Sequence, residues 1–181
     1  DIRRLVAFAG DEALEQQRLL RAAVAALPAE RIVFQNDSRD ILAVAEAMLA
    51  GELEYRRENY DVAFPHLREA VDLYDSLNYS EPWSWMMPPR HALGALLLEQ
   101  GHINDAASVY RADLGLDDTL VRPSQHPNNI WSLLGYAECC KLLDDSKSLE
   151  AILPELAKAQ QVADSSIEVS CFCRTTHECS D

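Results

Sequence analysis

The C-terminal segment carries the densest group of reactive side chains in the sequence. Three cysteines and one histidine fall within nine residues: Cys171, Cys173, His177 and Cys179. Three thiolates and one imidazole can form a tetrahedral zinc site, and a subset of them would suit copper(I). The Cys-x-Cys spacing is less usual than Cys-x-x-Cys, because one intervening residue strains a shared site. The segment therefore predicts zinc or copper binding, with ordinary thiols near a chain end as the alternative.

The same cysteines also allow a redox interpretation. Cys171 could form a reversible disulfide with Cys173 or Cys179, although no basic helix start lies near enough to lower a thiol pKa. The sequence has five cysteines, and the remaining two, Cys139 and Cys140, are adjacent. This is not the dispersed pattern of a disulfide framework, and it fits reduced thiols in the cytoplasm.

A second candidate site is the aromatic and sulfur-rich stretch 82–91, with the sequence PWSWMMPPRH. Its tryptophans and methionines could line a pocket for an apolar or cationic ligand, with Arg90 and His91 as polar anchors. The alternative is that both tryptophans and both methionines fill the gap between neighbouring helical hairpins. The stretch predicts either a binding surface or internal packing.

Other catalytic patterns are missing from the sequence. His66, His91, His102 and His126 are spaced so that no two share a helix face, and we expect them to be surface or capping residues. The sequence contains no Gly-x-Ser-x-Gly turn, no phosphate-binding glycine-rich loop and no Rossmann fingerprint. We therefore predict no catalytic residue and expect a protein that is not an enzyme.

The charge balance excludes some partners and favours others. Thirty acidic against sixteen basic residues give a formal net charge of -14, which repels nucleic acid and anionic membranes and favours a basic partner. The sequence has neither an apolar run of about 20 residues nor a secretory signal. We expect one soluble cytoplasmic domain. Because the sequence begins with Asp1, we also expect a processed form or part of a longer protein.

Apolar residues recur at helical spacing along most of the chain, whereas the only strand-like stretch is 31–34. Pro65 should lie in the first turns of its helix, Pro127 should be a first-turn residue, and Pro154 should kink its helix or delay its start. Asp144 and Asp145 should break and cap helices. Seven helices are predicted, at approximately 11–27, 38–57, 60–74, 90–101, 104–115, 127–143 and 148–163.

Three segments of the sequence align with one another around Gly51, Gly94 and Gly135, which are 43 and 41 residues apart. In the middle segment Leu93-Gly94 is followed by Ala106 and Tyr110. Small residues are needed where two helices cross closely, and Tyr110 would fill the space beside that crossing. This pattern resembles the tetratricopeptide repeat, although the spacing exceeds its usual length of about 34 residues.

The stretch 90–101 also resembles a group of uncharacterised microbial and fungal tetratricopeptide proteins. The family resemblance implies a right-handed stack of helical hairpins whose concave face binds peptides or other ligands. We therefore predict an all-α fold, an α-solenoid with about three repeats and an N-terminal helix. Its parts are an N-terminal helix and linker at 1–37, hairpin repeats at 38–77, 88–116 and 127–163, and an irregular tail at 164–181.

These observations predict a scaffold that binds a protein or peptide partner in a concave groove. The groove residues are Trp83, Trp85, Arg90, His91 and Trp131, and no organic cofactor is expected. The alternative is a metalloenzyme or metal carrier in which the cysteine tail binds zinc or copper, with His91 or His126 as further ligands.

Overall fold

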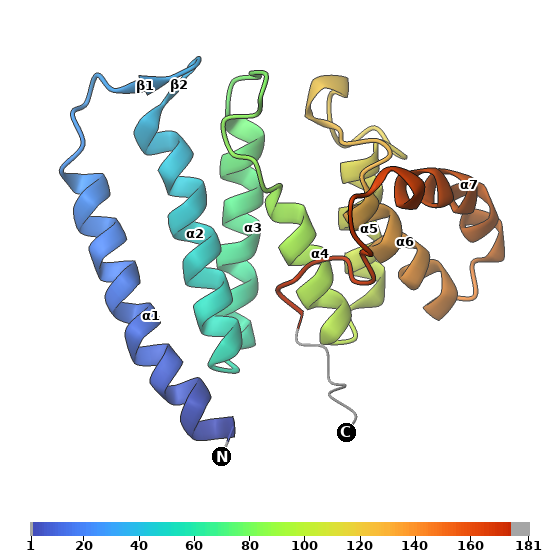
Figure 1. The fold of residues 1–181 in the computed structure, drawn as a ribbon, viewed down its shortest axis with the longest axis horizontal. Coiled ribbons are helices and arrows are strands. Elements are labelled where there is room, and N and C mark those ends of the chain that lie inside the picture. Colours follow the sequence, from blue (N-terminus) through green and yellow to red (C-terminus); the bar gives the residue numbers. More distant parts are fainter. Residues whose placement is uncertain (1, 175–181) are drawn as a thin grey trace. The chain divides into compact units, whose positions relative to one another are not determined.

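A computed structural model describes the backbone of residues 2–174 and the side chains from residue 12 onward. This part of the chain is mostly helical, and consecutive helices pack as adjacent pairs (Figure 1). The predicted helical fold class is therefore confirmed in its predominance of helices and in their sequential packing. The elements in chain order are α1 (Ile2–Ala25), β1 (Ile32–Val33), β2 (Asn36–Asp37), α2 (Ser38–Arg56), α3 (Tyr60–Ser76), α4 (Pro89–Glu99), α5 (Ile103–Leu114), the short 3-10 helix Arg122–Ser124, α6 (Ile130–Leu142) and α7 (Ser146–Val162).

The chain divides into two compact units, Asp1–Pro89 and Arg90–Asp181. In the first unit, α1, α2 and α3 lie side by side (Figure 1). Helix α2 packs closely on α3 because Gly51 has no side chain: a Cβ there would lie 2.6 Å from Leu67 Cγ. Leu67 and Val44 are fully buried at this contact layer. The small residue that the repeat pattern placed at position 51 therefore serves helix packing.

The second unit contains α4 to α7, and Tyr110 of α5 packs closely against α4 and α6. The Tyr110 side chain is fully buried. A Cβ at Gly94 would lie 2.5 Å from Tyr110 Cζ, and a Cβ at Gly135 would be closer still. The ring thus occupies space that two glycines leave on α4 and α6. The prediction that Tyr110 fills the space beside Gly94 is confirmed, and Ala106 is fully buried as well.

The first helix begins earlier than predicted. The pattern of Gly10 followed by Asp11 suggested a new start, but α1 runs from Ile2 through both residues. One glycine costs a helix only about 1 kcal/mol, and the preceding residues are mostly good helix formers. The cap signal was therefore outweighed by the propensity of its neighbours.

Helix α6 begins at Ile130, so the prediction that Pro127 lies in its first turn is wrong. Asn129 is the cap: its Oδ1 accepts hydrogen bonds from the backbone N–H groups of Trp131 (2.9 Å) and Ser132 (3.3 Å). An asparagine cap satisfies two otherwise unpaired donors, which a proline cannot do. The stronger start signal lies after the proline.

Helix α7 includes Pro154 and nevertheless begins at Ser146, so of the two predicted effects of this proline, a kink or a late start, the late start is wrong. Asp145 caps this helix by accepting a hydrogen bond from Ser148 N–H at 3.1 Å, as predicted for this acidic turn. Pro65 lies within α3, in the early turns where it was expected. In α7 the capping residue decides where the helix begins, and the proline is accommodated.

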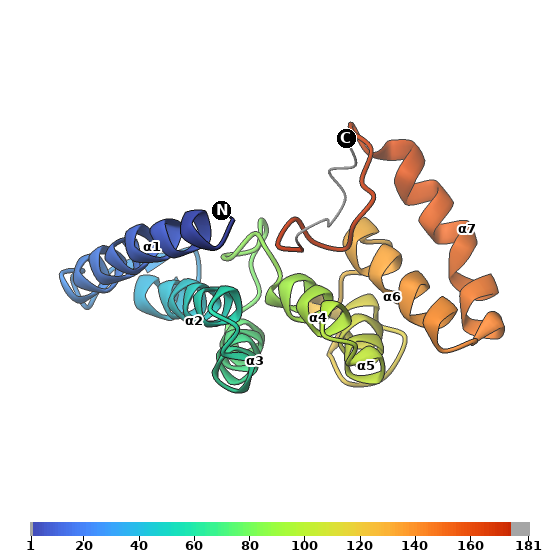
Figure 2. The ribbon, with the colours of Figure 1, turned by 90° about the horizontal axis from the view of Figure 1, so that it is seen from below.

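The short strand signal at 31–34 is confirmed as a two-stranded antiparallel hairpin, in which Ile32 pairs with Asp37 and Val33 with Asn36. After α7, the segment 163–174 returns to pack on α5 and α6 within the second unit (Figure 2). Within the described part of the chain, no helix has both the length and the hydropathy required to cross a bilayer.

Candidate functional site

Asn36, in β2, joins two loops at one end of the first unit. Its Nδ2 donates hydrogen bonds to the Asn78 carbonyl and to Ser84 Oγ, both at 2.8 Å. Its Oδ1 accepts a hydrogen bond from Asn78 N–H at 2.7 Å. Only 3% of Asn36 is exposed. This amide therefore fixes the loop 77–88 against the β1–β2 hairpin.

Further neutral hydrogen bonds reinforce the same junction. Asn78 Nδ2 donates to the carbonyl of Gln35 at 3.0 Å. The hydroxyl oxygens of Ser80 and Ser84 lie 2.8 Å apart. Neutral amide and hydroxyl groups carry these hydrogen bonds at the junction of the two loops.

The two joined loops present large apolar side chains to solvent. Single exposed apolar residues are ordinary, but their concentration on neighbouring loops is typical of a binding surface. We call this set the loop patch. It consists of Ile32, Val33 and Phe34 from the hairpin, and Tyr79, Trp83, Met86 and Met87 from the loop 77–88.

The two methionines of the loop patch are strongly exposed. Met86 is 64% exposed and Met87 is 62% exposed, so neither side chain lies in the core of the first unit. Trp83 is exposed as well, whereas Trp85 is half-buried and its Nε1 is buried without a hydrogen-bond partner among the described residues. The stretch therefore faces solvent through Trp83 and the methionines.

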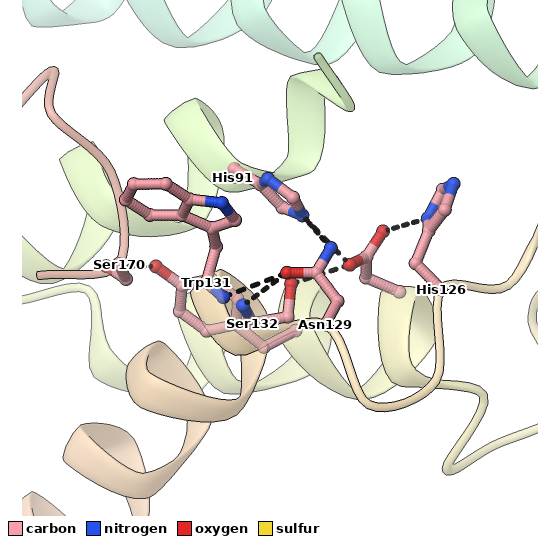
Figure 3. A network of polar contacts seen from close by, with 8 residues as sticks. His91, His126, Asn129, Trp131, Ser132 and Ser170 are labelled. Carbon is pink, nitrogen blue, oxygen red and sulfur yellow. Dashed lines mark hydrogen bonds and ion pairs between the residues drawn. The ribbon is translucent and has the colours of Figure 1, made fainter. Parts of the chain in front are cut away.

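A second cluster, in the second unit, centres on the fully buried carboxylate of Asp113 in α5 (Figure 3). Asp113 Oδ1 lies 2.7 Å from His126 Nδ1. Asp113 Oδ2 accepts a hydrogen bond from Ser132 Oγ at 2.6 Å and faces His91 Nε2 at 3.2 Å. The backbone also contributes, because His126 N–H donates to the Asp113 carbonyl at 2.6 Å.

Asn129 connects the helix cap of α6 to this cluster. Its Oδ1 is occupied by the two backbone N–H groups of the cap, so its Nδ2 must be the group that lies 2.8 Å from His91 Nε2. His91 Nε2 therefore faces an amide donor and a carboxylate oxygen together. With a proton on Nε2 it donates to Asp113, and without one it accepts from Asn129.

Asp113 is ionised at neutral pH despite its burial. Burial alone would raise the pKa of Asp113, but hydrogen bonds from His126 and His91, and the charge of these two rings when protonated, hold that pKa well below its ordinary value. The cluster therefore contains a buried negative charge. It connects α4, α5, the loop that precedes α6, and α6 itself.

The Asp113 cluster has the residue types of a nucleophilic triad but not the required connections. In a triad an imidazole lies between the serine and the carboxylate and removes the serine proton. Here Ser132 donates directly to Asp113, and the Ser132 side chain is fully buried. This arrangement orients the side chains and does not activate a nucleophile, so the cluster fits a structural role.

The sequence interpretation missed this cluster. His91, Asp113 and His126 lie on three different elements, so spacing along any one helix does not reveal them. The expectation of surface or capping histidines is wrong for His126, which is 3% exposed, and for His91, which is mostly buried. The acidic residue between two apolar residues at the C-terminal end of α5 was the one available signal.

The segment 163–174, which we call the strap, contacts α5 and α6 through alternate residues. Tyr110 O–H donates to Ser170 Oγ at 2.8 Å. The Phe172 ring meets Trp131 edge-on, with centroids 4.9 Å apart. Arg174 makes the third contact: its guanidinium donates to the two carboxylate oxygens of Glu138 at 2.6 and 3.1 Å.

The cysteines of the strap are joined: Cys171 and Cys173 form a disulfide. In this oxidised form their sulfurs are not thiolate ligands. The other two proposed ligands, His177 and Cys179, lie outside the described residues, so the zinc or copper site stays a prediction. Among the residues that the structure describes, no group of three or more histidine, cysteine, aspartate or glutamate side chains is placed to hold a metal ion.

Cys139 and Cys140 of α6 are buried free thiols. Burial raises the pKa of Cys139 to about 12, with a smaller contribution from the neighbouring Glu138 carboxylate. Burial also raises the pKa of Cys140. Because thiolates are the reactive form, these two cysteines are poor nucleophiles.

The five proposed groove residues are divided between the units. Trp83 and Trp85 belong to the first unit, and Arg90, His91 and Trp131 belong to the second. Within the second unit, Asn129 brings His91 and Trp131 together, because it contacts the ring of one and the backbone of the other. Arg90 is only 6% exposed.

No protein-family model, curated protein or solved structure matches this chain. The resemblance to tetratricopeptide repeats stays a prediction.

Proposed function

We propose that this chain is a protein-interaction module, built as a tetratricopeptide-like stack of helical hairpins, that binds a basic segment of a partner protein. The loop patch is the contact surface. The observation that carries this proposal is that seven large apolar side chains are exposed on two loops that Asn36 joins. Tryptophan, tyrosine and methionine are the residue types that binding surfaces favour.

Preorganisation of the loops supports a binding role. Association loses affinity when loops must be ordered on contact, and prior ordering removes that cost. Here the amide of Asn36 is fully used in holding the loop 77–88, so Trp83 and its neighbours are presented on an ordered backbone. The methionines add side-chain adaptability, because the flexible thioether fits irregular surfaces.

The charge of the chain indicates the chemistry of the partner. A net charge of -14 accelerates encounter with a positively charged segment and disfavours acidic ones. Two exposed acidic residues accompany the loop patch in the sequence: Glu30 precedes its hairpin residues, and Glu81 lies between Tyr79 and Trp83. The partner segment should therefore carry apolar anchors next to lysine or arginine residues.

The helical framework supports the tetratricopeptide-like part of the proposal. Consecutive helices pack as adjacent pairs, and Gly51 and Gly94 allow the close approach that such hairpins require. A rigid helical stack with functional loops is a common arrangement for interaction modules.

The test is a triple variant of the loop patch, Trp83→Ala/Met86→Ser/Met87→Ser. The matched control removes three exposed apolar side chains from the second unit: Leu142→Ser/Leu153→Ser/Val162→Ser. Wild-type and both variants are immobilised, captured proteins are identified, and each is then purified and its affinity measured directly at low and high salt.

We expect at least one captured protein to bind the wild type and the control equally and the loop-patch variant about tenfold more weakly, which corresponds to about 1.4 kcal/mol. Its affinity should fall as salt rises. Equal binding by all three proteins would overturn the proposal. Self-association of the wild type that the loop-patch variant loses would also overturn it, because the occupant would then be a second copy.

A further inference from the structure

We infer that Cys171 and Cys173 form a redox-active pair that exchanges with small thiols and disulfides of the glutathione class, and that its closure holds the strap on α5 and α6. This inference concerns the second unit and does not depend on the loop patch. It rests on three observations: the pairing of the cysteines, their accessibility, and the contacts that alternate with them.

The two cysteines lie in a tight turn that places their sulfurs together. Their Cα atoms are 5.2 Å apart and their sulfurs are bonded. Cys173 N–H donates to Cys171 Sγ at 3.1 Å, and Arg174 N–H donates to the Cys171 carbonyl at 3.2 Å. The backbone of the strap is thus folded so that intramolecular pairing needs little rearrangement.

The pair is accessible in a way that the other described cysteines are not. Cys171 and Cys173 are half-buried, so a small thiol can reach them, and the residue between them, Phe172, is 77% exposed. In contrast, Cys139 and Cys140 are buried free thiols with raised pKa values. Of the described cysteines, the strap pair is therefore the one suited to exchange.

A stabilising role explains this disulfide poorly. The two cysteines are separated by only two positions, and a disulfide stabilises a fold mainly by closing a long loop in the unfolded chain. A ring this short restricts little of the unfolded chain. What it does restrict is the backbone between neighbouring contacts of the strap.

Those contacts alternate with the cysteines. Ser170, Phe172 and Arg174 contact Tyr110, Trp131 and Glu138. Closure of the ring removes backbone freedom between the three contacts, so they can form together at a lower entropic cost. Opening of the ring returns that freedom, and the contacts at Phe172 and Arg174 lie nearest to the surface and should be lost first.

The exchange balances with a small disulfide RSSR as oxidant. One cysteine loses its proton and its thiolate attacks a sulfur of RSSR, which forms a mixed disulfide and releases RS⁻. The second cysteine, also deprotonated, attacks the first cysteine's sulfur and releases the other RS⁻. The two thiolates released take up the two protons. In total, two cysteine thiols and RSSR give one protein disulfide and two RSH, with two electrons transferred to RSSR.

The first experiment follows the oxidation state of each cysteine in the intact chain. The protein is equilibrated in buffers with increasing ratios of glutathione to glutathione disulfide, free thiols are alkylated, and peptides are analysed by mass spectrometry before and after reduction. We expect Cys171 and Cys173 to change together and reversibly, so that the reduced pair carries two alkyl groups and the oxidised pair carries none, while Cys139 and Cys140 stay reduced.

Two outcomes would overturn the assignment of the pair. One is a disulfide between either strap cysteine and Cys179 in place of the predicted ring. The other is stoichiometric zinc or copper, measured by elemental analysis, that protects both thiols of the reduced protein from alkylation, because the segment would then be a metal site. A third outcome, thiols that stay reduced in excess glutathione disulfide, would overturn the redox activity of the pair.

The second experiment tests the effect on the strap by hydrogen exchange. On reduction, the amides of Cys173 and Arg174 should exchange about tenfold faster in the wild type. In Cys171→Ser/Cys173→Ser they should exchange fast in both buffers, which controls for the reductant. Tyr110→Phe removes the hydrogen bond to Ser170 but keeps both cysteines. In this variant, reduction should still accelerate the exchange of the Cys173 and Arg174 amides. Equal exchange in oxidised and reduced wild type would overturn the proposed effect of closure.

Discussion

Each unit fixes its loops with one buried polar side chain, but the two side chains differ in charge. Asn36 holds the hairpin and the loop 77–88 of the first unit with a neutral amide. Asp113 holds α4, α6 and the intervening loop of the second unit with a carboxylate. The stability that the neutral Asn36 junction contributes should not depend on pH. Loss of a partner from the ionic Asp113 junction should cost more unfolding free energy than loss of a partner from the neutral one.

The two junctions also serve different surfaces. The Asn36 junction lies beneath exposed apolar residues and orders the loop patch. The Asp113 cluster lies inside the second unit, where a charge is tolerable only because every oxygen has a partner. The predictions below test this contrast.

Asp113→Ala should have the largest effect. It leaves the buried groups of His91, His126 and Ser132 without their acceptor, and the loss of one partner from a buried ionic cluster costs about 3–5 kcal/mol. Urea unfolding followed by circular dichroism measures the change. The exposed Asp118 is the control, and Asp118→Ala should remain within about 0.5 kcal/mol of the wild type. Similar losses in both variants would contradict the proposed importance of the cluster.

Asn36→Ala should cost less, about 1–3 kcal/mol, because the groups left unpaired at Asn78 and Ser84 are neutral. Hydrogen exchange at the Asn78 amide should accelerate, since its acceptor is removed. The exposed Asn104 provides a matched control in the second unit. If Asn36→Ala destabilised the protein more than Asp113→Ala, the contrast between a neutral and an ionic junction would be wrong.

The smallest effect, and the one that separates the two junctions best, is the dependence on pH. The folded-state pKa of Asp113 lies below its ordinary value of 3.8, so the carboxylate stabilises the fold fully above about pH 4. This contribution should decrease as the pH falls further. Unfolding free energies measured between pH 6 and pH 2.5 should therefore decline less steeply in Asp113→Asn than in the wild type, whereas Asn36→Ala should keep the wild-type slope.

The sequence predicted the helices well because amphipathic spacing and caps are local properties. It also predicted the small residue at Gly94 and the role of Tyr110, since the repeat pattern implies which helices touch. It placed the starts of α1 and α6 incorrectly, because competing cap and proline signals cannot be ranked without the packing around them. The Asn129 cap, for example, is reinforced by a contact with His91 on another helix.

The candidate sites were less predictable than the fold. The Asp113 cluster joins residues that lie 13 to 22 positions apart on separate elements. The junction of Asn36 with Asn78 spans 42 positions. Neither junction follows a helical or strand period, so neither leaves a pattern in the sequence. The tryptophan and methionine stretch was recognised from composition alone, but its exposure depends on how the Asn36 junction directs the loop.

The ring of Tyr110 couples three helices through the two glycines that leave room for it. Any larger residue at position 94 or 135 needs a smaller one at position 110, and a smaller residue at 110 would leave both glycines facing a void. These three positions should therefore vary together among sequences that keep this fold. If α5 were transferred to another helical scaffold, the glycines at positions 94 and 135 would have to be transferred with it.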